Sequence, residues 1–553
     1  MSDDIPIPGT VQLVDTQHVL HVEHGKNAQD IVLIPQPSDD PDDPLRWSPP
    51  RKTTTVVCAM GWCFISAFTC AGLSPAYVLI ERDTGISIGD LSTGNGLMFL
   101  FLGWGTLITQ CIALNYGRRP TLIVSMLGTA LANLWTAYIS SRGEFFANRI
   151  ILGTLASPVE TLLEVIIADI HFTHDRGFYM SVYSWTLWCG AFLGPVTSGY
   201  IAQEYGWRWI QYTMSILGAV MTILTFFLFE ETMYFRYGNT CNLPAISGLP
   251  DKEAAPGSGP LEVNAKPDYT EDLKDASMQN RGDSSSMPQE TPATSSIPES
   301  TKTYAQKLKV WGFRDPRQPN TFKFFLLPFQ LLRYSGISFA GLLVGGILSW
   351  YNVVGGSLAL ILSNEPYNFS ANNIGLTYLS CVVGVTIGCF LSGSITDILA
   401  VRLSRKNNGI MEPEYRLWMC ILALVAHPAG CLLYGVGAFY QIHWIGVVIG
   451  IGLISVTLPM GSNLGFVYIL DTYKEVGGEG VVSTILVRNL MGFAFGYAVI
   501  PMIENLGLRN TFVLLAVLGT ALWCTCIFMI FYGKPLRRSS AVSYWKLVGR
   551  YEG

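Results

Sequence analysis

The sequence predicts an all-α membrane protein whose twelve transmembrane helices form two repeats of six. Half of the 553 residues are hydrophobic, 14% are charged and the mean hydropathy is +0.35, values that exclude a water-soluble globule of this size. Twelve spans of about 20 residues need roughly 240 residues, and the apolar segments supply them. These segments fall into two groups of six, separated by a long polar stretch.

The first group of spans follows a polar start. Residues 1–52 are acidic and interrupted by prolines, so we expect a disordered cytoplasmic tail. No charged start followed by a short apolar stretch and a cleavage site opens the sequence, so the first span is expected to act as its own insertion signal. A six-helix bundle is then predicted over 53–230. Its spans are expected at 53–79, 92–114, 119–140, 146–169, 178–202 and 209–229.

A second bundle follows a compositional break. Residues 231–321 are rich in Ser, Pro, Glu, Asp and Lys and cannot bury a core, which predicts a disordered cytoplasmic linker. Six more spans are predicted within 322–535, and residues 536–553 are expected to be a cytoplasmic tail. The second set of spans is expected at 333–362, 374–400, 415–438, 441–469, 482–504 and 510–532.

Lysine and arginine near the span ends predict the orientation in the membrane. Arg51, Lys52 and Arg402 represent a larger group on one side, whereas Arg82 and Arg142 lie on the other. Positive charge favours the cytoplasmic side of a membrane. Both termini are therefore expected to be cytoplasmic.

The two halves repeat one another. A shift of about 300 residues places Gly190-x-x-x-Gly194 on Gly492-x-x-x-Gly496, and the same shift aligns the glycines that precede spans six and twelve. Halves related in this parallel way place a binding site near the bilayer midplane and alternate its access by rocking.

The fifth span carries a stripe of small residues with a proline. At about 100° per residue, Gly190 and Gly194 lie on one line of the helix, and Pro195 and Gly199 lie on the line beside it. Small-xxx-small surfaces let another backbone approach closely in lipid, and the proline loosens the hydrogen-bond ladder. The stripe therefore predicts a tightly packed, bent helix that acts as a gate.

This spacing, Gly-x-x-x-Gly-Pro-x-x-Ser-Gly, resembles the fifth-span motif of drug:proton antiporters in the major facilitator superfamily. The turn Asp169-Ile-His-Phe-Thr-His-Asp-Arg176-Gly and the leader Asp43-Pro-Leu-Arg-Trp-Ser are similar to segments of fungal members. The resemblance covers residues 39–535 apart from the linker, and it points to the twelve-span drug:proton antiporter branch, polyamine-permease-like relatives included. It implies the major facilitator fold and alternating access.

A second set of residues resembles the cytoplasmic latch of the superfamily. Gly117-Arg118-Arg119 looks like the end of its Gly-x-x-x-Asp-Arg-x-Gly-Arg-Arg loop, but Leu114 stands where the loop has its carboxylate. Asp169 is a possible substitute partner for Arg118. The alternative is that these arginines only fix the topology. The expected latch residues are Gly117, Arg118, Arg119, Asp169, Arg176, Gly393 and Asp397.

The fourth span carries the candidate proton-coupling groups. Arg149-x-x-x-Gly153 resembles a motif of proton-coupled members, in which the arginine is associated with coupling. On a continuous helix Glu160 and Glu164 lie within about 60° of Arg149. Ionisable groups inside a membrane face the protein interior or a wet cavity. Arg149, Glu160 and Glu164 are therefore expected to couple protons or to line the central cavity.

These features predict a secondary active transporter that moves a small organic molecule by alternating access, coupled to protons. Efflux of drugs or secondary metabolites is the first expectation, because the fifth-span motif is tied by resemblance to antiport. The alternative is proton-coupled uptake of polyamines or other cationic nutrients, which rests on Glu160 and Glu164. A non-transporting sensor built on the same fold is a third possibility.

Other classes of protein lack support in the sequence. It has no nucleotide-binding loop of the Gly-x-x-x-x-Gly-Lys-Ser/Thr kind and no nucleophile or paired-histidine motif at a span end, so neither an ATP-driven pump nor an enzyme is expected. The expected partners are a small-molecule substrate, protons and the lipid bilayer, with no nucleic acid, cofactor or metal. We expect a monomer in the plasma membrane, with the vacuolar membrane as the alternative.

Overall fold

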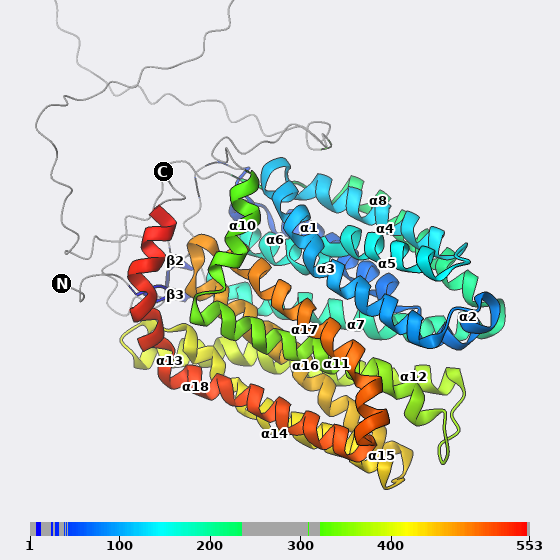
Figure 1. Cartoon of the computed structure of the whole chain (residues 1–553). Coiled ribbons are helices and arrows are strands. Elements are labelled where there is room, and N and C mark those ends of the chain that lie inside the picture. Colours follow the sequence, from blue (N-terminus) through cyan, green and yellow to red (C-terminus); the bar gives the residue numbers. More distant parts are fainter. Residues whose placement is uncertain are drawn as a thin grey trace, which may run out of the picture.

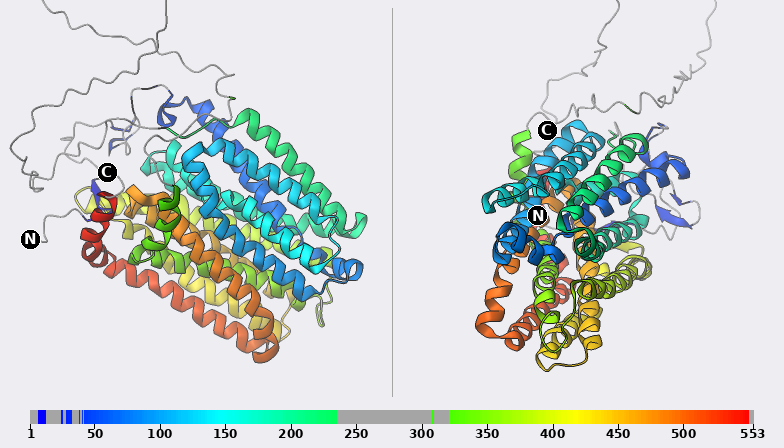
Figure 2. Two further views of the ribbon diagram at one scale, coloured as in Figure 1. Left: turned by 45° about the horizontal axis from the view of Figure 1, so that its top comes forward. Right: turned by 90° about the vertical axis from the view of Figure 1, so that its right-hand side faces the viewer.

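A computed structural model describes residues 7–12, 24–25, 28–32, 38, 40, 42–234, 308 and 321–549. The predicted all-α fold with twelve long helical segments is confirmed in this part of the chain, which adds only two short strand pairs. Figure 1 shows the segments of residues 49–228 packed beside those of residues 335–549, and the views in Figure 2 agree. We call these two groups the N-half and the C-half.

The N-half contains six spans. Its elements are α1 (Pro49–Ala71), α2 (Tyr77–Thr84), α3 (Ile88–Tyr116), α4 (Arg118–Thr136), α5 (Arg142–Ala156), η3 (Ser157–Glu160), α6 (Leu162–Ile170), α7 (Thr173–Tyr205) and α8 (Trp207–Leu228), with the short turns η1 (Pro44–Arg46) and η2 (Ser74–Ala76). The segments α5, η3 and α6 together form span four.

The C-half also contains six spans, preceded by the shorter helix α10. Its elements are α10 (Thr321–Leu331), α11 (Ser335–Leu362), α12 (Ala371–Phe390), η4 (Leu391–Ile395), α13 (Thr396–Lys406), η5 (Pro413–Met419), α14 (Cys420–Cys431), η6 (Leu432–Val436), α15 (Gly437–Phe439), α16 (Trp444–Thr472), η7 (Lys474–Val476), α17 (Gly477–Leu506) and α18 (Leu508–Gly549). Span eight runs from α12 to α13, and span nine from η5 to α15.

Ten of the segments are long and apolar enough to cross a membrane by themselves. The other two are α4 and α7, which pack among those ten, α4 against α8 and α7 against α1 and α12. The ends of α8 and α10 that flank the gap at 235–320 lie at one end of the bundle, which we call the linker end. The opposite end is called the far end.

The internal repeat is visible in how the glycines pack. A Cβ on Gly190 or Gly194 of α7 would lie 2.6 Å from the carbonyl oxygen of Phe64 or Phe68 on α1. A Cβ on Gly492 of α17 would lie 2.6 Å from the side chain of Leu348 on α11. In each half, the fifth span therefore packs through glycine against the first.

Span four differs from the continuous helix that the sequence suggested. Pro158 has no N–H for the carbonyl of Thr154, which instead accepts a hydrogen bond from Ser157 Oγ at 2.8 Å. The chain tightens into the 3₁₀ turn η3, and Thr161 leaves helical geometry at φ −127° before α6 begins. The angular relation expected between Arg149 and Glu164 on one helix face therefore does not hold.

Two ends of the chain also differ from expectation. Parts of the expected disordered tail are structured, because β1 (Val11–Gln12) pairs antiparallel with β4 (Ile410–Met411) and α1 already begins at Pro49. A second pair joins β2 (His24–Gly25) to β3 (Ala28–Val32). At the other end α18 continues to Gly549, through most of the expected tail over 536–553. The expected linker over 231–321 lies almost entirely outside the described residues.

Candidate functional site

A small cavity of about 60 Å³ lies between the two halves. Its walls come from α1, α3, η3 and α7 of the N-half and from α11 and α17 of the C-half. The lining residues of α3, α7 and α11 stand near the middle of those helices, so the cavity lies roughly midway through the bundle. This is where a transporter with two rocking halves holds its substrate.

The cavity wall carries an ion pair that joins the two halves. Glu160 of η3 pairs with Arg488 of α17, and both side chains are about nine-tenths buried. The 3₁₀ turn at Pro158 places Glu160 here, because it rotates the following residues out of the α5 register. Separating the partners would leave a charge buried without compensation, which is strongly unfavourable.

Aromatic rings also line the same cavity. Tyr351 of the C-half lies beside Trp188 and Phe99 of the N-half in tilted and edge-on contacts, with ring centroids 5.4 and 6.2 Å apart. Phe192 continues the cluster to Tyr351 at 5.6 Å. The cavity thus combines one ion pair with aromatic surface, which suits a small organic molecule.

Glu164 has a different environment from Glu160. Its side chain is fully buried in α6, and among the described residues neither carboxylate oxygen has a hydrogen-bond partner. It lies near Cys63 of α1 and Tyr183 of α7, and it is not among the residues that line the cavity. The structure therefore separates the two glutamates that a continuous helix would place together.

Arg149 also lies away from the cavity. Its guanidinium is buried in the N-half, donates to Thr136 Oγ1 at 3.4 Å and lies 4.9 Å from the ring of Phe145. Within the described residues no carboxylate lies in ion-pair range of it. Gly153, one turn later, packs tightly on α3, where a Cβ would lie 2.3 Å from the carbonyl oxygen of Met98.

The predicted gate residues of α7 lie at two interfaces. Gly190 and Gly194 contact α1 within the N-half, as described above, and Gly199 is buried further along the helix. Pro195 lies inside the continuous helix α7, and its carbonyl oxygen lies 3.7 Å from where a Cβ on Gly375 of α12 would stand. The part of α7 around Pro195 therefore borders the C-half on the far side of the cavity.

Towards the linker end, polar side chains close the space between the halves. The amide nitrogen of Asn463 on α16 donates to Ser181 Oγ of α7 at 2.9 Å and to Ser392 Oγ of η4 at 2.8 Å. Ser184 Oγ donates to the amide oxygen of the same residue. Gly393 packs directly on Ser181, whose Oγ would lie 2.3 Å from an added Cβ. One amide thus ties together spans five, eight and ten.

The expected latch residues lie at the linker end as two charge groups. In the N-half, Arg118 Nε lies 3.4 Å from Asp169 Oδ2, the partner considered from the sequence. In the C-half, Arg416 pairs with Asp397 and, at 3.0 Å, with Asp471. Arg176 is buried and interacts electrostatically with both Asp169 and Asp471, so it connects the two groups.

Gly117 and Arg119 hold the N-half together. Gly117 has φ +110°, and an added Cβ would lie 2.5 Å from Glu231 Oε2. That carboxylate accepts the backbone N–H groups of Arg118 and Arg119 at 3.0 and 3.1 Å, which caps the start of α4. The Arg119 side chain donates to the carbonyl of Phe226 at 2.5 Å, so it fixes α4 to α8.

Three residues of these sites were not selected from the sequence. Arg488 is a charged residue in span eleven, and Asn463 carries an amide in span ten. Arg416 is a charged residue at the start of span nine. A polar or charged residue inside an apolar span is itself a signal of an interior contact. Which partner it meets is set by tertiary packing and cannot be read from spacing.

His171, in the turn between α6 and α7, predicts a pH effect on stability. Burial, helped by the positive charge of Lys52, lowers the pKa of His171 to about 4. Because the unfolded chain takes up this proton more readily, the stabilising contribution is complete above about pH 6.5 and is lost as the pH falls towards 4. The melting temperature of the wild-type protein should therefore fall more between pH 7 and pH 5 than that of His171→Gln. Equal falls would contradict this.

Comparisons with known proteins agree with this architecture. The model of the Major Facilitator Superfamily matches residues 60–496. The chain is 28% identical to the uncharacterised MFS-type transporter C1271.10c of Schizosaccharomyces pombe, across 98% of this chain and 94% of that protein, and 26% identical to Protein HOL1 of Saccharomyces cerevisiae, across 99% and 98%.

Among solved structures, the proton:xylose symporter XylE, bound to 6-bromo-6-deoxy-D-glucose, superposes with a TM-score of 0.56. The match covers 87% of this chain and 96% of that one at 12% identity, so it bears on the fold alone. Taken with the two six-span halves and the cavity between them, the family match shows that this chain is a membrane transporter of the major facilitator superfamily.

Proposed function

We propose that the protein couples transport of a small organic molecule to protons through the central cavity. The observation that carries this proposal is the buried Glu160–Arg488 pair, which lines the cavity and joins the two halves. A proton on Glu160 removes its attraction for Arg488, and a charged substrate can do the same by competing for either partner. Proton binding and substrate binding are then linked through one contact.

Two further groups support the proposal. Glu164 is a buried carboxylate with no hydrogen-bond partner in the described part of the chain, so it is a candidate for holding the proton while Glu160 stays paired. Arg149 carries the charge that the resemblance associates with coupling, but it acts from within the N-half through Thr136 rather than from the cavity wall. Alternating access exposes the cavity to each side of the membrane in turn.

Export of drugs or secondary metabolites is the favoured direction, because the fifth span carries the antiport-type motif. Its proline borders the C-half at the far end, where an export gate would open. The linker end is assigned to the cytoplasm from the distribution of Lys and Arg, and the plasma membrane, with a monomeric protein, is the proposed setting. The vacuolar membrane remains the alternative location.

Uptake of a polyamine or another organic cation is the second candidate. It is favoured because Glu160 lines the same cavity as Trp188 and Tyr351, and aromatic faces and a carboxylate both attract cations. In that case the cation would take the place of the Arg488 guanidinium beside Glu160.

Proteoliposomes with an imposed pH gradient test the proposal. Wild-type protein should concentrate a substrate taken from a growth screen, such as spermidine or a hydrophobic dye, and should move protons with it. Glu160→Gln leaves Arg488 buried without its partner and should lower stability, and in the protein that still folds it should abolish the concentrating step. Glu164→Gln should weaken that step. A cationic substrate should respond more strongly than a neutral one.

The possible outcomes separate the alternatives. If both variants transport at the wild-type rate and with the wild-type pH dependence, the glutamates are structural and proton coupling through them is wrong. If no substrate of a broad panel moves protons or itself crosses the membrane, a sensor becomes the better explanation.

A further inference from the structure

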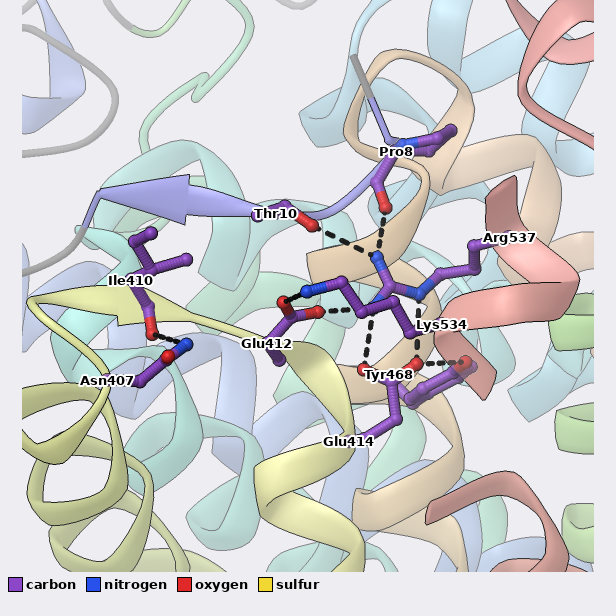
Figure 3. A network of polar contacts seen from close by, with 9 residues as sticks. All are labelled: Pro8, Thr10, Asn407, Ile410, Glu412, Glu414, Tyr468, Lys534 and Arg537. Carbon is purple, nitrogen blue, oxygen red and sulfur yellow. Dashed lines mark hydrogen bonds and ion pairs between the residues drawn. The ribbon is translucent and has the colours of Figure 1, made fainter. Parts of the chain in front are cut away.

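An N-terminal segment far from the cavity is seated on the C-half at the linker end. Arg537 of α18 is fully buried there, and Figure 3 shows its guanidinium pointing towards residues 8–10. Its Nη1 donates to the carbonyl oxygen of Pro8 at 2.5 Å and lies 3.4 Å from Thr10 Oγ1. The next two residues form strand β1 on β4 of the C-half. We define residues 8–12 as the docking segment.

The C-half presents a preformed receptor to this segment. Nη2 of Arg537 lies 2.7 Å from both Glu412 Oε2 and Glu414 Oε2, and Nε lies 2.9 Å from Glu414 Oε1. Lys534 pairs with Glu412 at 2.5 Å. Two carboxylates and two cations balance in charge. The two carboxylates accept hydrogen bonds from Nε and Nη2 of the arginine, which leaves Nη1 to donate to the backbone of the docking segment.

Gly9 is the residue on which the docking geometry depends. It has φ +83°, and an added Cβ would lie 2.7 Å from Thr472 Cα and 3.0 Å from Pro413 Cγ. Only glycine combines this backbone conformation with so close an approach. Gly9 therefore fits between the end of α16 and the start of η5.

These two elements carry the C-half charge group of the linker end. Asp471 is adjacent to Thr472, and Arg416 lies in η5 three residues after Pro413. Arg416 joins Asp471 to Asp397, and Asp397 lies against the N-half, where its Oδ1 would be 2.2 Å from a Cβ on Gly177. A segment that holds α16 against η5 thereby holds the group that touches the opposite half.

The same chain is anchored on the N-half a short distance later. Tyr234, just beyond α8, donates from its hydroxyl to Asp40 Oδ2 at 2.9 Å, and Ser38 binds Asp43 at 2.9 Å. Arg51 of α1 pairs with Glu230 at 2.6 Å. The docking segment is thus a part of the N-half's own chain bound to the C-half. The contact is intramolecular and does not depend on protein concentration.

We infer that the docking segment is a built-in lock that stabilises the arrangement in which the linker end is closed, and that its release favours opening. The lock acts on conformational exchange and does not depend on which substrate the cavity takes. Losing contacts of this kind, a charge-assisted hydrogen bond with a strand pair, should change the ratio of open to closed linker ends by about tenfold.

The test uses the full-length protein with two measurements. Hydrogen exchange of the peptide containing residues 8–12 reports docking. The distance between spin labels at Tyr116→Cys of the N-half and Lys406→Cys of the C-half, both exposed positions, reports opening of the linker end. Cys241 and Cys524 are replaced by serine so that only the new cysteines react, since the other cysteines are buried.

Gly9→Ala and deletion of residues 2–12 are the test variants, and Gly85→Ala is the matched control. Gly85 also has a positive φ, +73°, but nothing lies within 4 Å of an added Cβ. Gly9→Ala should speed hydrogen exchange in the docking segment. Both test variants should increase the fraction of molecules with a long distance between the spin labels, and the control should change neither measurement. The proposed lock is wrong if residues 8–12 stay protected from hydrogen exchange in Gly9→Ala. It is also wrong if release or deletion of the segment leaves the distribution of spin-label distances unchanged.

Discussion

Replacing Arg488 by methionine is expected to abolish transport and to destabilise the protein severely. The substitution leaves the Glu160 carboxylate buried without its partner. Removing one partner of a buried ion pair typically lowers the free energy of unfolding by about 3–5 kcal/mol, whereas removing both charges often leaves it nearly unchanged. The double variant Glu160→Gln/Arg488→Met should therefore recover most of the stability in a thermal unfolding assay, yet still fail to couple protons to substrate.

An exposed ion pair provides the matched control. Arg142 Nε lies 3.1 Å from Asp90 Oδ1, but its side chain is 64% exposed. Arg142→Met removes the same charge and should change stability by no more than about 1 kcal/mol, with transport retained. If Arg488→Met is no more destabilising than Arg142→Met, Glu160 and Arg488 are solvated rather than locked together, and the linkage proposed for the cavity has no physical basis.

Leucine at Gly194 is expected to damage both folding and conformational exchange. Even a Cβ at this position would lie 2.6 Å from the backbone oxygen of Phe68, and a backbone cannot move aside as a side-chain tip can. The α7–α1 contact must therefore separate, which should greatly reduce the yield of folded protein and slow exchange between states in what remains. Fluorescence-detected gel filtration and spin-label distances measure these two effects.

Gly355 of α11 is the control for Gly194→Leu. It is also a glycine within a long span, but nothing lies within 4 Å of an added Cβ. Gly355→Leu should leave folding and exchange intact. A folded Gly194→Leu protein with normal exchange but weaker substrate binding would show that this position shapes the cavity rather than the packing of the fifth span.

The fold was largely predictable because its signal is local. Each span needs a run of apolar residues, and the duplicated Gly-x-x-x-Gly spacing at 190–194 and 492–496 marked equivalent helices before any contact was known. The ends were less predictable. Residues 8–12 carry no apolar pattern and include a proline, and their position on the C-half depends on Arg537, which lies more than 500 positions later and donates a hydrogen bond to the carbonyl of Pro8.

The candidate site was predictable only in part. Intramembrane charge drew attention to Arg149, Glu160 and Glu164 alike. A helical projection could not separate them, because it assumes a constant angle per residue. The chain instead tightens at Pro158, before Glu160, and leaves helical geometry at Thr161, between the two glutamates. The pairing of Glu160 with Arg488 depends on how the halves meet, which no local pattern contains.

The 3₁₀ turn of span four also makes this helix two rigid rods with a joint between them. Two carbonyl groups at the joint have hydrogen-bond donors. Ser157 Oγ donates to the carbonyl of Thr154, and the hydroxyl of Tyr183 donates to the carbonyl of Val159 at 2.8 Å. Glu160 is the last residue of the joint itself. We expect a rotation at this turn to move the Glu160 carboxylate while α5 and α6 keep their packing. The N-half can thus redirect its cavity charge without being rebuilt, and any force on that charge is applied where span four bends most easily.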